Sequence, residues 1–255
     1  MVYHKIDPRN EIGINSISPK RFREQVQFLV DNQYQTCTFE DIISSKKSHS
    51  KAIIITFDDG YESVFKYSYP ILKEAGFKAV IFIITGYVGQ LNNWDANLAG
   101  IQFRHLSIHQ IELLVKDGWE IGSHSVNHRP LSYLNQKRLN DEIIHSFNEL
   151  KKITKKDITS FSYPFGMQNS RVQKVVQQAG YKLACRNISG NNNCDNLLAI
   201  PRIPVYKFDT VRTLKRKLAL IEYPLEKLKL LILNWPGRFT PLYQILFRKH
   251  LSLEK

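Results

Sequence analysis

Short apolar runs alternate with stretches of helical periodicity along most of the chain, and this alternation restricts the fold more than any other feature. Residues 52–57 (AIIITF) and 79–85 (AVIFIIT) have the length and β-branched content of buried strands. Between them, residues 67–75 have helical spacing that stops at Gly76. Repeated βα units of this kind predict a parallel sheet, either open or closed into a barrel.

The same alternation continues towards the C-terminus. A helix is expected at 107–117, with Ser107 as N-cap and Gly118 as its stop. Further helices are expected at 135–153 and 170–179, and strands at 2–6, 119–122, 158–163, 181–185 and 197–205. In a parallel sheet or barrel, the chemistry belongs at the carboxyl ends of the strands.

The composition changes from about residue 209. Residues 214–233 are apolar and basic with helical spacing, interrupted by Pro224. We expect a catalytic domain over residues 1–208, followed by a basic amphipathic helical extension over 209–255. The extension either packs on the domain or makes a peripheral membrane contact through basic residues beside an apolar face.

The formal net charge of +13 favours acidic surroundings, such as nucleic acid, anionic lipid or an acidic polysaccharide. A solvated basic surface explains the same charge equally well. The sequence contains no recognised nucleic-acid-binding module, so no nucleic-acid partner is expected. Charge alone therefore does not identify what the protein binds.

Three polar motifs follow predicted strands. The first is TFDDG at 56–60, where two adjacent carboxylates repel each other unless a cation lies nearby. Taken alone, this motif is equally typical of a solvated turn. The second is HSVNH at 124–128, whose two histidines are four residues apart and can converge on one ion. Two imidazoles and one carboxylate leave coordination positions open, as a catalytic metal site requires.

The third motif is YPFG at 163–166. Its proline and glycine fix a loop whose backbone N–H groups could face an oxyanion, although a simple strand-to-helix turn has the same composition. The order TFDDG, HSxxH, YPFG resembles the polysaccharide deacetylase family, also called the NodB-homology family or carbohydrate esterase family 4. The resemblance covers about residues 1–206 and implies a distorted (β/α) barrel with a metal site at its mouth.

The resemblance implies a role for each matching residue. Asp59, His124 and His128 would bind a divalent metal, and Asp58 would act as general base on the activated water. The opening YHKI at 3–6 is similar to a circularly permuted branch that includes the biofilm poly-N-acetylglucosamine deacetylases. In that branch the general acid comes from the N-terminal strand, so His4 would protonate the leaving amine.

Supporting roles follow in the same way. Ser125 would support the metal-site loop, and the backbone N–H of Phe165 would stabilise the oxyanion. Tyr61 and Trp94 are candidates for stacking on a sugar ring. Zinc is the expected ion because histidine and carboxylate ligands suit it, and cobalt, nickel or manganese could replace it.

The sequence departs from the family in two places. Many members carry an arginine in the third motif that orients the base, whereas this chain has Ser162 there. The DxxDW-like fourth motif has no clear match. We expect Arg202 to supply the missing positive charge beside Asp58.

The expected reaction is hydrolysis of an N-acetyl group, or less favourably an O-acetyl group, on an amino-sugar polysaccharide or glycolipid. An amide is a poor electrophile and its amine a poor leaving group, so both a metal and an acid are needed. The alternative is a catalytically weak carbohydrate-binding or envelope-assembly protein that keeps the cavity. No signal peptide is recognised, which predicts a cytoplasmic protein or one at the inner membrane face, while the resemblance favours the cell envelope.

Overall fold

Seven short strands form a parallel sheet at the centre of the structure, in the order β1-β6-β7-β8-β9-β10-β11. The computed structural model describes the chain except for residues 10, 12, 45–50, 94–100, 188–194 and 220–255. The strands are β1 (Val2–Tyr3), β6 (Thr56–Phe57), β7 (Val80–Ile83), β8 (Glu120–Ser123), β9 (Ser160–Ser162), β10 (Leu183–Asn187) and β11 (Ile200–Arg202). Because all pairs are parallel, the carboxyl ends of all seven strands lie at the same end of the sheet.

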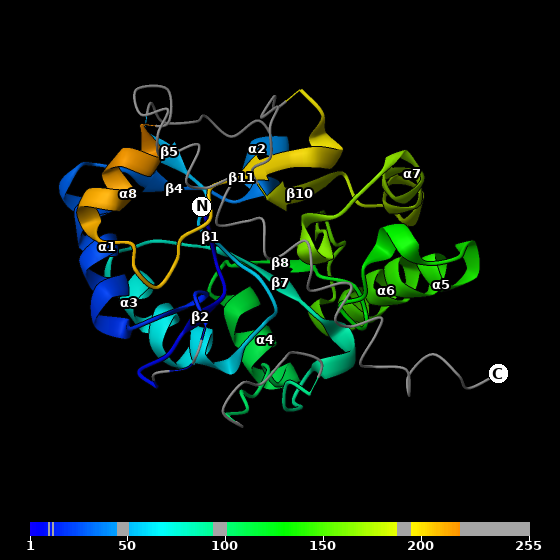
Figure 1. Ribbon diagram of the computed structural model, residues 1–255, viewed down its shortest axis with the longest axis horizontal. Helices are drawn as coiled ribbons and strands as arrows, with labels where there is room; N and C mark the ends of the chain where they lie inside the picture. The colour runs from blue at the N-terminus through cyan, green and yellow to red at the C-terminus, as the bar shows by residue number, and fades with distance from the viewer. Residues whose placement is uncertain (10, 12, 45–50, 94–100, 188–194, 220–255) are drawn as a thin grey trace.

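The two edges of this sheet meet through the N-terminal strand. The N–H of Val2 donates to the carbonyl of Ile203 at 2.8 Å, and the N–H of Val205 donates to the carbonyl of Val2 at 2.9 Å. A parallel bridge joins Val2 to Pro204 between these bonds. The sheet is thus a nearly closed barrel surrounded by helices (Figure 1), which confirms the predicted distorted (β/α) barrel.

Helices cover the outside of the barrel, and those within residues 67–75, 107–117, 135–154 and 170–179 lie where the periodicity predicts them. They are α1 (Pro19–Asp31), α2 (Phe39–Ile43), α3 (Tyr69–Glu74), α4 (Ile108–Lys116), α5 (Gln136–Asn140), α6 (Ser146–Thr154), α7 (Ser170–Ala179) and α8 (Val211–Leu218). Ser107 caps α4 by accepting from the N–H of Gln110, as its sequence predicts. The chain leaves α7 at Gly180, whose φ of 109° favours glycine.

Two helical runs contain a π-helical turn. Residues 136–154 form one continuous run in which η5 (Asp141–His145) joins α5 to α6, and η1 (Val64–Ser68) leads directly into α3. Short 3₁₀ turns are η2 (Thr85–Tyr87), η4 (Leu131–Tyr133), η6 (Pro164–Gly166) and η7 (Leu197–Ala199). Single π turns often occur at functional sites, and η5 lies beside the second motif.

Three predicted strands, at 2–6, 52–57 and 197–205, are wrong in their extent, the first of them because residues 5–6 leave the barrel. Residues 52–57 form two strands rather than one, because β5 (Ala52–Ile53) pairs with β4 (Gln35–Thr36) in a separate sheet before the chain enters the barrel as β6. Residues 197–205 contain only the short β11, because Pro201 and Pro204 lack the N–H groups that a longer ladder needs. A second small sheet pairs β2 (Lys5–Ile6) with β3 (Ser16–Ile17).

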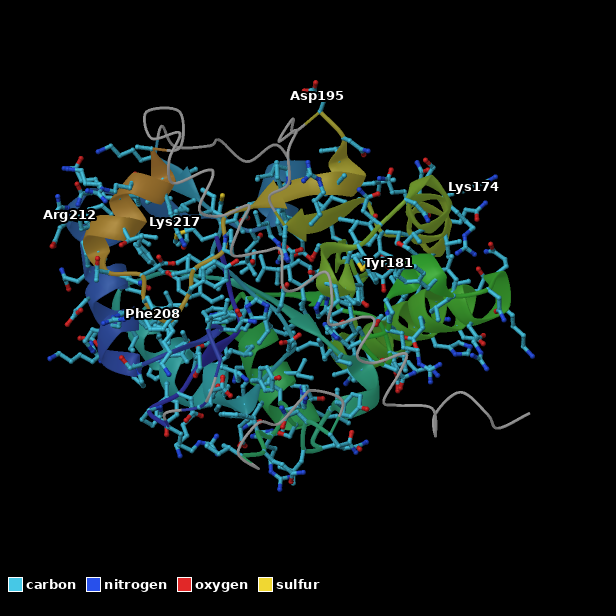
Figure 2. All side chains as sticks on the ribbon, viewed as in Figure 1. Lys174, Tyr181, Asp195, Phe208, Arg212 and Lys217 are labelled. Carbon is cyan, nitrogen blue, oxygen red and sulfur yellow. The ribbon has the colours of Figure 1, made fainter. Side chains whose placement is uncertain are left out.

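The described part of the C-terminal extension is α8, which contacts α1. Lys217 of α8 is buried, donates to the carbonyl of Pro204 at 2.8 Å and pairs with Asp209. Figure 2 shows two exposed basic residues, Arg212 of α8 and Lys174 of α7, at opposite sides of the molecule. The remainder of the predicted extension lies outside the described residues. Among the residues that the structure describes, no helix has the length and apolar character to cross a membrane.

Candidate active site

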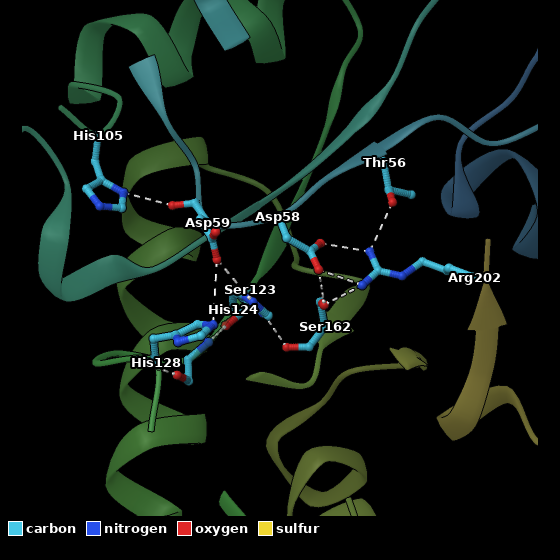
Figure 3. Close-up of polar contacts among 10 residues, drawn as sticks. Thr56, Asp58, Asp59, His105, Ser123, His124, His128, Ser162 and Arg202 are labelled. Atoms are coloured by element: carbon cyan, nitrogen blue, oxygen red, sulfur yellow. Dashed lines mark hydrogen bonds and ion pairs between the residues drawn. The ribbon is translucent and has the colours of Figure 1, made fainter. Parts of the chain in front are cut away.

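The polar motifs meet at the carboxyl ends of the barrel strands. Asp58 and Asp59 directly follow β6, and His124 directly follows β8. Ser162 is the last residue of β9, and Arg202 is the last residue of β11. All five side chains are buried, and Figure 3 shows them converging from their separate strands.

Asp59, His124 and His128 form a compact cluster. Asp59 Oδ1 lies 3.5 Å from His124 Nε2 and 3.6 Å from His128 Nε2. Their ligand-type atoms all lie within 4.8 Å of one another. A carboxylate and two imidazoles, brought together from residues up to 69 positions apart, have the composition of a catalytic metal site with open positions.

The protonation of the histidines fits a cation at this point. His124 Nδ1 lies 2.7 Å from the carbonyl oxygen of Ser162, which can only accept, so Nδ1 carries the proton and the lone pair of Nε2 faces Asp59. Burial lowers the pKa of His124. Burial, and after it the neighbouring His124, takes the pKa of His128 well below its usual value. Neutral imidazoles and the oxygens of a carboxylate place electron-rich atoms around one point, which a divalent cation would satisfy.

Several residues in and beside this cluster adopt backbone conformations that most residues avoid. Positive φ angles occur at Asp59 (72°), Ser125 (66°), His128 (53°) and Phe165 (60°). Such residues cost about 1–3 kcal/mol each and persist only where their surroundings determine them. The turns that carry the polar side chains therefore depend on contacts beyond the motifs themselves.

The Asp59 turn is fixed by a residue that the motifs do not contain. His105 Nδ1 lies 2.8 Å from the carbonyl oxygen of Asp59, and the N–H of Leu106 donates to the carbonyl of Gly60 at 2.9 Å. Gly60 has a φ of 70°, and a Cβ at this position would lie 2.9 Å from Ile83 Cδ1. Glycine is thus required both for the backbone conformation and for the close approach of β7.

Asp58 lies beside this cluster and pairs with Arg202. The guanidinium makes a bidentate contact with the carboxylate, at 2.8 Å from Nη1 to Oδ1 and 2.7 Å from Nη2 to Oδ2. Ser162 Oγ donates to Asp58 at 3.1 Å and accepts from Arg202 at 2.8 Å, while Thr56 Oγ1 accepts from Arg202 at 3.0 Å. Arg202 thus supplies the positive charge beside Asp58 that Ser162, at the third-motif position, cannot supply.

These contacts decide the charge of Asp58. Burial alone would raise the pKa of its carboxyl, but Arg202, followed by His124, outweighs burial and holds that pKa well below its usual range. Asp58 is therefore ionised at neutral pH. A carboxylate held by a bidentate arginine also has a fixed orientation.

His4 lies next to Asp58 through the register of the first strand pair. Tyr3 pairs with Phe57, and the N–H of Asp58 donates to the carbonyl of Tyr3 at 2.9 Å. Within the described part of the chain, the buried Nδ1 of His4 has no hydrogen-bond partner. Burial lowers the pKa of His4 to about 4, although the Asp58 charge opposes that shift. The N-terminal strand thus brings an imidazole to the site, as the resemblance implies.

Ser125 and Phe165 both contact His128. Ser125 Oγ accepts from the N–H of His128 at 3.1 Å, which stabilises the turn between the two histidines. The ring of Phe165 packs edge-on against the imidazole of His128, with 4.5 Å between centroids. The third motif therefore lies against the second.

Of the two predicted sugar-stacking residues, the structure describes Tyr61, which does not face the site. Tyr61 is only 1 % exposed, and its ring packs on His105 and Phe103, with centroids 4.9 Å and 6.0 Å away. The prediction for Tyr61 is wrong because its bridge to His105 turns the ring into the core beneath the Asp59 turn. Trp94 lies outside the described residues.

Sequence reasoning missed Thr56, His105 and Glu142, which hold the site residues through backbone or side-chain hydrogen bonds. A signal existed for Glu142, because it lies at helical spacing with the buried Leu139 and Ser146. A carboxylate on the buried face of an amphipathic helix needs buried partners. His105 and Thr56 carry no such signal.

Comparison with known proteins agrees with the geometry. The sequence model of the polysaccharide deacetylase family matches residues 45–184, which is more than half of the chain. YxkH of Bacillus subtilis is 29% identical over 210 residues, covering 80% of this chain and 70% of that protein. The poly-beta-1,6-N-acetyl-D-glucosamine N-deacetylase of Staphylococcus aureus is 29% identical over 184 residues, and the match spans 68% of this chain and 61% of the relative.

Solved structures show the same fold. The Streptococcus pyogenes deacetylase PplD, in complex with acetate, superposes with a TM-score of 0.74 at 22% identity, covering 85% of this chain and 96% of that chain. BC0361, a polysaccharide deacetylase from Bacillus cereus, gives a TM-score of 0.72 at 25% identity, covering 86% of this chain and 67% of that chain. The chain belongs to the polysaccharide deacetylase family.

Proposed function

We propose that this protein is a metal-dependent deacetylase that hydrolyses N-acetyl groups, and less favourably O-acetyl groups, on an amino-sugar polysaccharide or glycolipid. The observation that carries the proposal is the convergence of Asp59, His124 and His128 beside an ionised Asp58 at the mouth of the barrel. Family membership supports the deacetylase chemistry.

Asp59, His124 and His128 would hold the divalent ion. A bound ion acidifies water and polarises the acetyl carbonyl, and zinc suits this donor set, with cobalt, nickel or manganese as replacements. His124 is held ready for this role, because its Nδ1 proton is engaged by the Ser162 carbonyl and only Nε2 is left to face Asp59.

Asp58 is proposed as the general base. Its carboxylate is ionised and oriented by Arg202, so it can accept a proton from the attacking water. The same ion pair lowers the basicity of this carboxylate, and a bound ion that acidifies the water would offset that loss. Arg202 therefore keeps Asp58 ionised and fixes the orientation of its carboxylate.

His4 is proposed as the acid that protonates the leaving amine. The resting imidazole is neutral because burial lowers its pKa to about 4. Negative charge that develops on the substrate beside it would raise this pKa and favour the imidazolium form. The backbone N–H of Phe165, in the loop that packs on His128, is proposed to donate to the developing oxyanion.

The amino-sugar polymer is proposed from the name of the Staphylococcus aureus relative, a poly-N-acetylglucosamine deacetylase. The match spans 61% of that relative's length, so its substrate comes to this chain only as a proposal. A peripheral membrane contact through the basic C-terminal segment belongs to the same proposal, because basic residues beside apolar ones in its sequence favour an anionic lipid surface.

The test is acetate release from a panel of N-acetylated glycans, including N-acetylglucosamine oligomers, with and without a chelator. We expect release by the wild type that the chelator abolishes and that added zinc or cobalt restores. Asp59→Ala should lose both metal and turnover, whereas Asp58→Asn should keep the metal and lose turnover. Retained metal with no acetate release from any glycan, and glycan binding unchanged in Asp58→Asn, would instead support a carbohydrate-binding protein.

A further inference from the structure

Glu142 is a buried carboxylate outside the three motifs. It lies in the π-helical turn η5 and is 4 % exposed. Burying an ionised carboxylate costs several kcal/mol unless hydrogen-bond donors surround it. The donors that surround Glu142 belong to the turn that carries the two site histidines.

Each carboxylate oxygen of Glu142 accepts from this turn. Oε2 accepts from the backbone N–H groups of Val126 and Asn127, at 3.0 Å and 2.8 Å. Oε1 accepts from the side-chain amide of Asn127 at 2.8 Å, and Arg129 Nε lies 3.5 Å from the same oxygen. The carboxylate thus binds the backbone midway between His124 and His128.

The opposite side of the turn is held by η2. The N–H of Thr85 donates to the carbonyl of Ser125 at 3.1 Å, and the N–H of Gly86 donates to the carbonyl of Val126 at 2.9 Å. A Cβ on Gly86 would lie 2.7 Å from that carbonyl oxygen, so the two segments are in close contact. The turn is therefore clamped, with its carbonyls bound by η2 and its N–H groups bound by Glu142.

This clamp explains how the turn keeps its conformation. Ser125 and His128 both have positive φ angles, which cost free energy and need contacts from outside the turn to hold them. Charge-assisted bonds to a carboxylate are roughly twice as strong as neutral ones. We propose that Glu142 is a positioning residue, which fixes the 124–128 turn so that the Nε2 atoms of His124 and His128 both face Asp59. This inference rests on the metal centre of the proposed function.

The variant Glu142→Gln tests this role because it keeps the size of the side chain. Its single amide oxygen can still accept from the two backbone N–H groups, but these bonds lose their charge assistance, and its NH₂ group would either face the NH₂ group of Asn127 or make that amide rotate. Adding Asn127→Asp restores a donor and an acceptor across this contact and returns the net charge to that of the wild type. Glu149→Gln is the matched control, because Glu149 is exposed on the same helical run.

The readout is metal affinity, measured by titrating the metal-depleted proteins with zinc in competition with a chelator, together with the absorption spectrum of bound cobalt. Residues that orient metal ligands typically change affinity about 10- to 100-fold. We expect a loss in this range and an altered cobalt spectrum for Glu142→Gln, recovery of most of the loss in the double variant, and wild-type behaviour for Glu149→Gln.

A fallback variant and two contradicting outcomes complete the test. If Glu142→Gln does not fold, Asn127→Ala removes one of the three bonds without altering the helix and should still weaken zinc binding several-fold. Unchanged affinity and spectrum in the folded variants would overturn the role of Glu142 while leaving the proposed function intact. A wild type that binds neither zinc nor cobalt would overturn the metal centre itself, and the positioning role with it.

Discussion

At the scale of single residues, Arg202 and Asp58 stabilise each other's charge in the core. Both side chains are at most 5 % exposed, and each would carry an unpaired buried charge without the other. A buried pair of this kind does not add net stability over apolar residues, but breaking it is costly. Its value here lies in the orientation of Asp58, which a lysine with a single ammonium group could not reproduce.

We therefore predict that Arg202→Ala lowers both stability and turnover. Loss of one partner should cost about 3–5 kcal/mol in the free energy of unfolding, measured with urea. Turnover should fall and its pH profile should shift, because the pKa of Asp58 is no longer held down. Arg212→Ala is the control, since this exposed arginine should change stability by no more than about 0.5 kcal/mol. Full turnover with an unchanged pH profile in Arg202→Ala would exclude the orienting role.

A second prediction concerns Gly60. Gly60→Ala places a Cβ 2.9 Å from Ile83 Cδ1 and forces a residue with a side chain to a φ of 70°. We expect a loss of about 1–3 kcal/mol in unfolding free energy. Ile83→Val removes the clashing atom but not the backbone strain, so a double-mutant cycle should show partial recovery. Strictly additive losses would mean that the contact with Ile83 is not the cause.

The site residues divide into those the sequence reveals and those it does not. Asp59, His124 and His128 stand in motifs because metal chemistry restricts both residue type and spacing. Arg202 was inferred from a missing charge, which is a chemical requirement rather than a pattern. His105 binds a backbone carbonyl, and any residue with a donor could satisfy that need, so it leaves no signature in a single sequence.

At the scale of secondary-structure elements, β8 carries a polar residue at each end. Its last residue, Ser123, leads into the histidine turn, while its first residue, Glu120, is buried at the opposite end of the barrel. Glu120 accepts from the Ser160 hydroxyl and, at 2.9 Å, from the N–H of Glu40. Burial nevertheless outweighs these bonds and raises the pKa of Glu120 to about 7.

This shift predicts a pH-dependent stability. Between pH 4.5 and about 7 the unfolded chain has ionised Glu120 while the folded chain retains its proton. Stability contributed by this residue should therefore fall as pH rises through this window and level off above it, by up to about 3 kcal/mol at 1.4 kcal/mol per pKa unit. Glu120→Gln cannot ionise, so its urea unfolding free energy, compared with the wild type between pH 5 and 8, should lack this slope. Parallel pH curves for the two proteins would contradict the buried, protonated state.

The extents of elements were predicted less well than their existence. The run at 52–57 is uniformly apolar, and nothing in it marks the point where the chain passes from one sheet to another, since that change depends on β4 and β1 as partners. The helix over 136–154 was predicted nearly to the residue because its apolar spacing is local. Its π-helical turn was not predicted, although that turn carries Glu142.

At the scale of the whole molecule, the barrel is completed by pairing the beginning of the described chain with the segment after β11. This closure brings both His4 and Arg202 close to Asp58. The three metal-ligating candidates also come from distant positions in the chain, at 59, 124 and 128. They can share an ion only when the barrel is folded, so metal binding and global stability should be linked.

The last prediction follows from this linkage. A ligand that binds only the folded state at 100 times its dissociation constant adds about 2.7 kcal/mol. For a chain of this size that should raise the midpoint of thermal unfolding by roughly 5–10 °C. Differential scanning fluorimetry of the metal-depleted protein with increasing zinc measures the shift. Asp59→Ala should abolish it and His109→Ala, at an exposed histidine, should keep it. A shift that survives in Asp59→Ala would mean that the stabilising ion does not depend on Asp59, which would contradict the proposed centre.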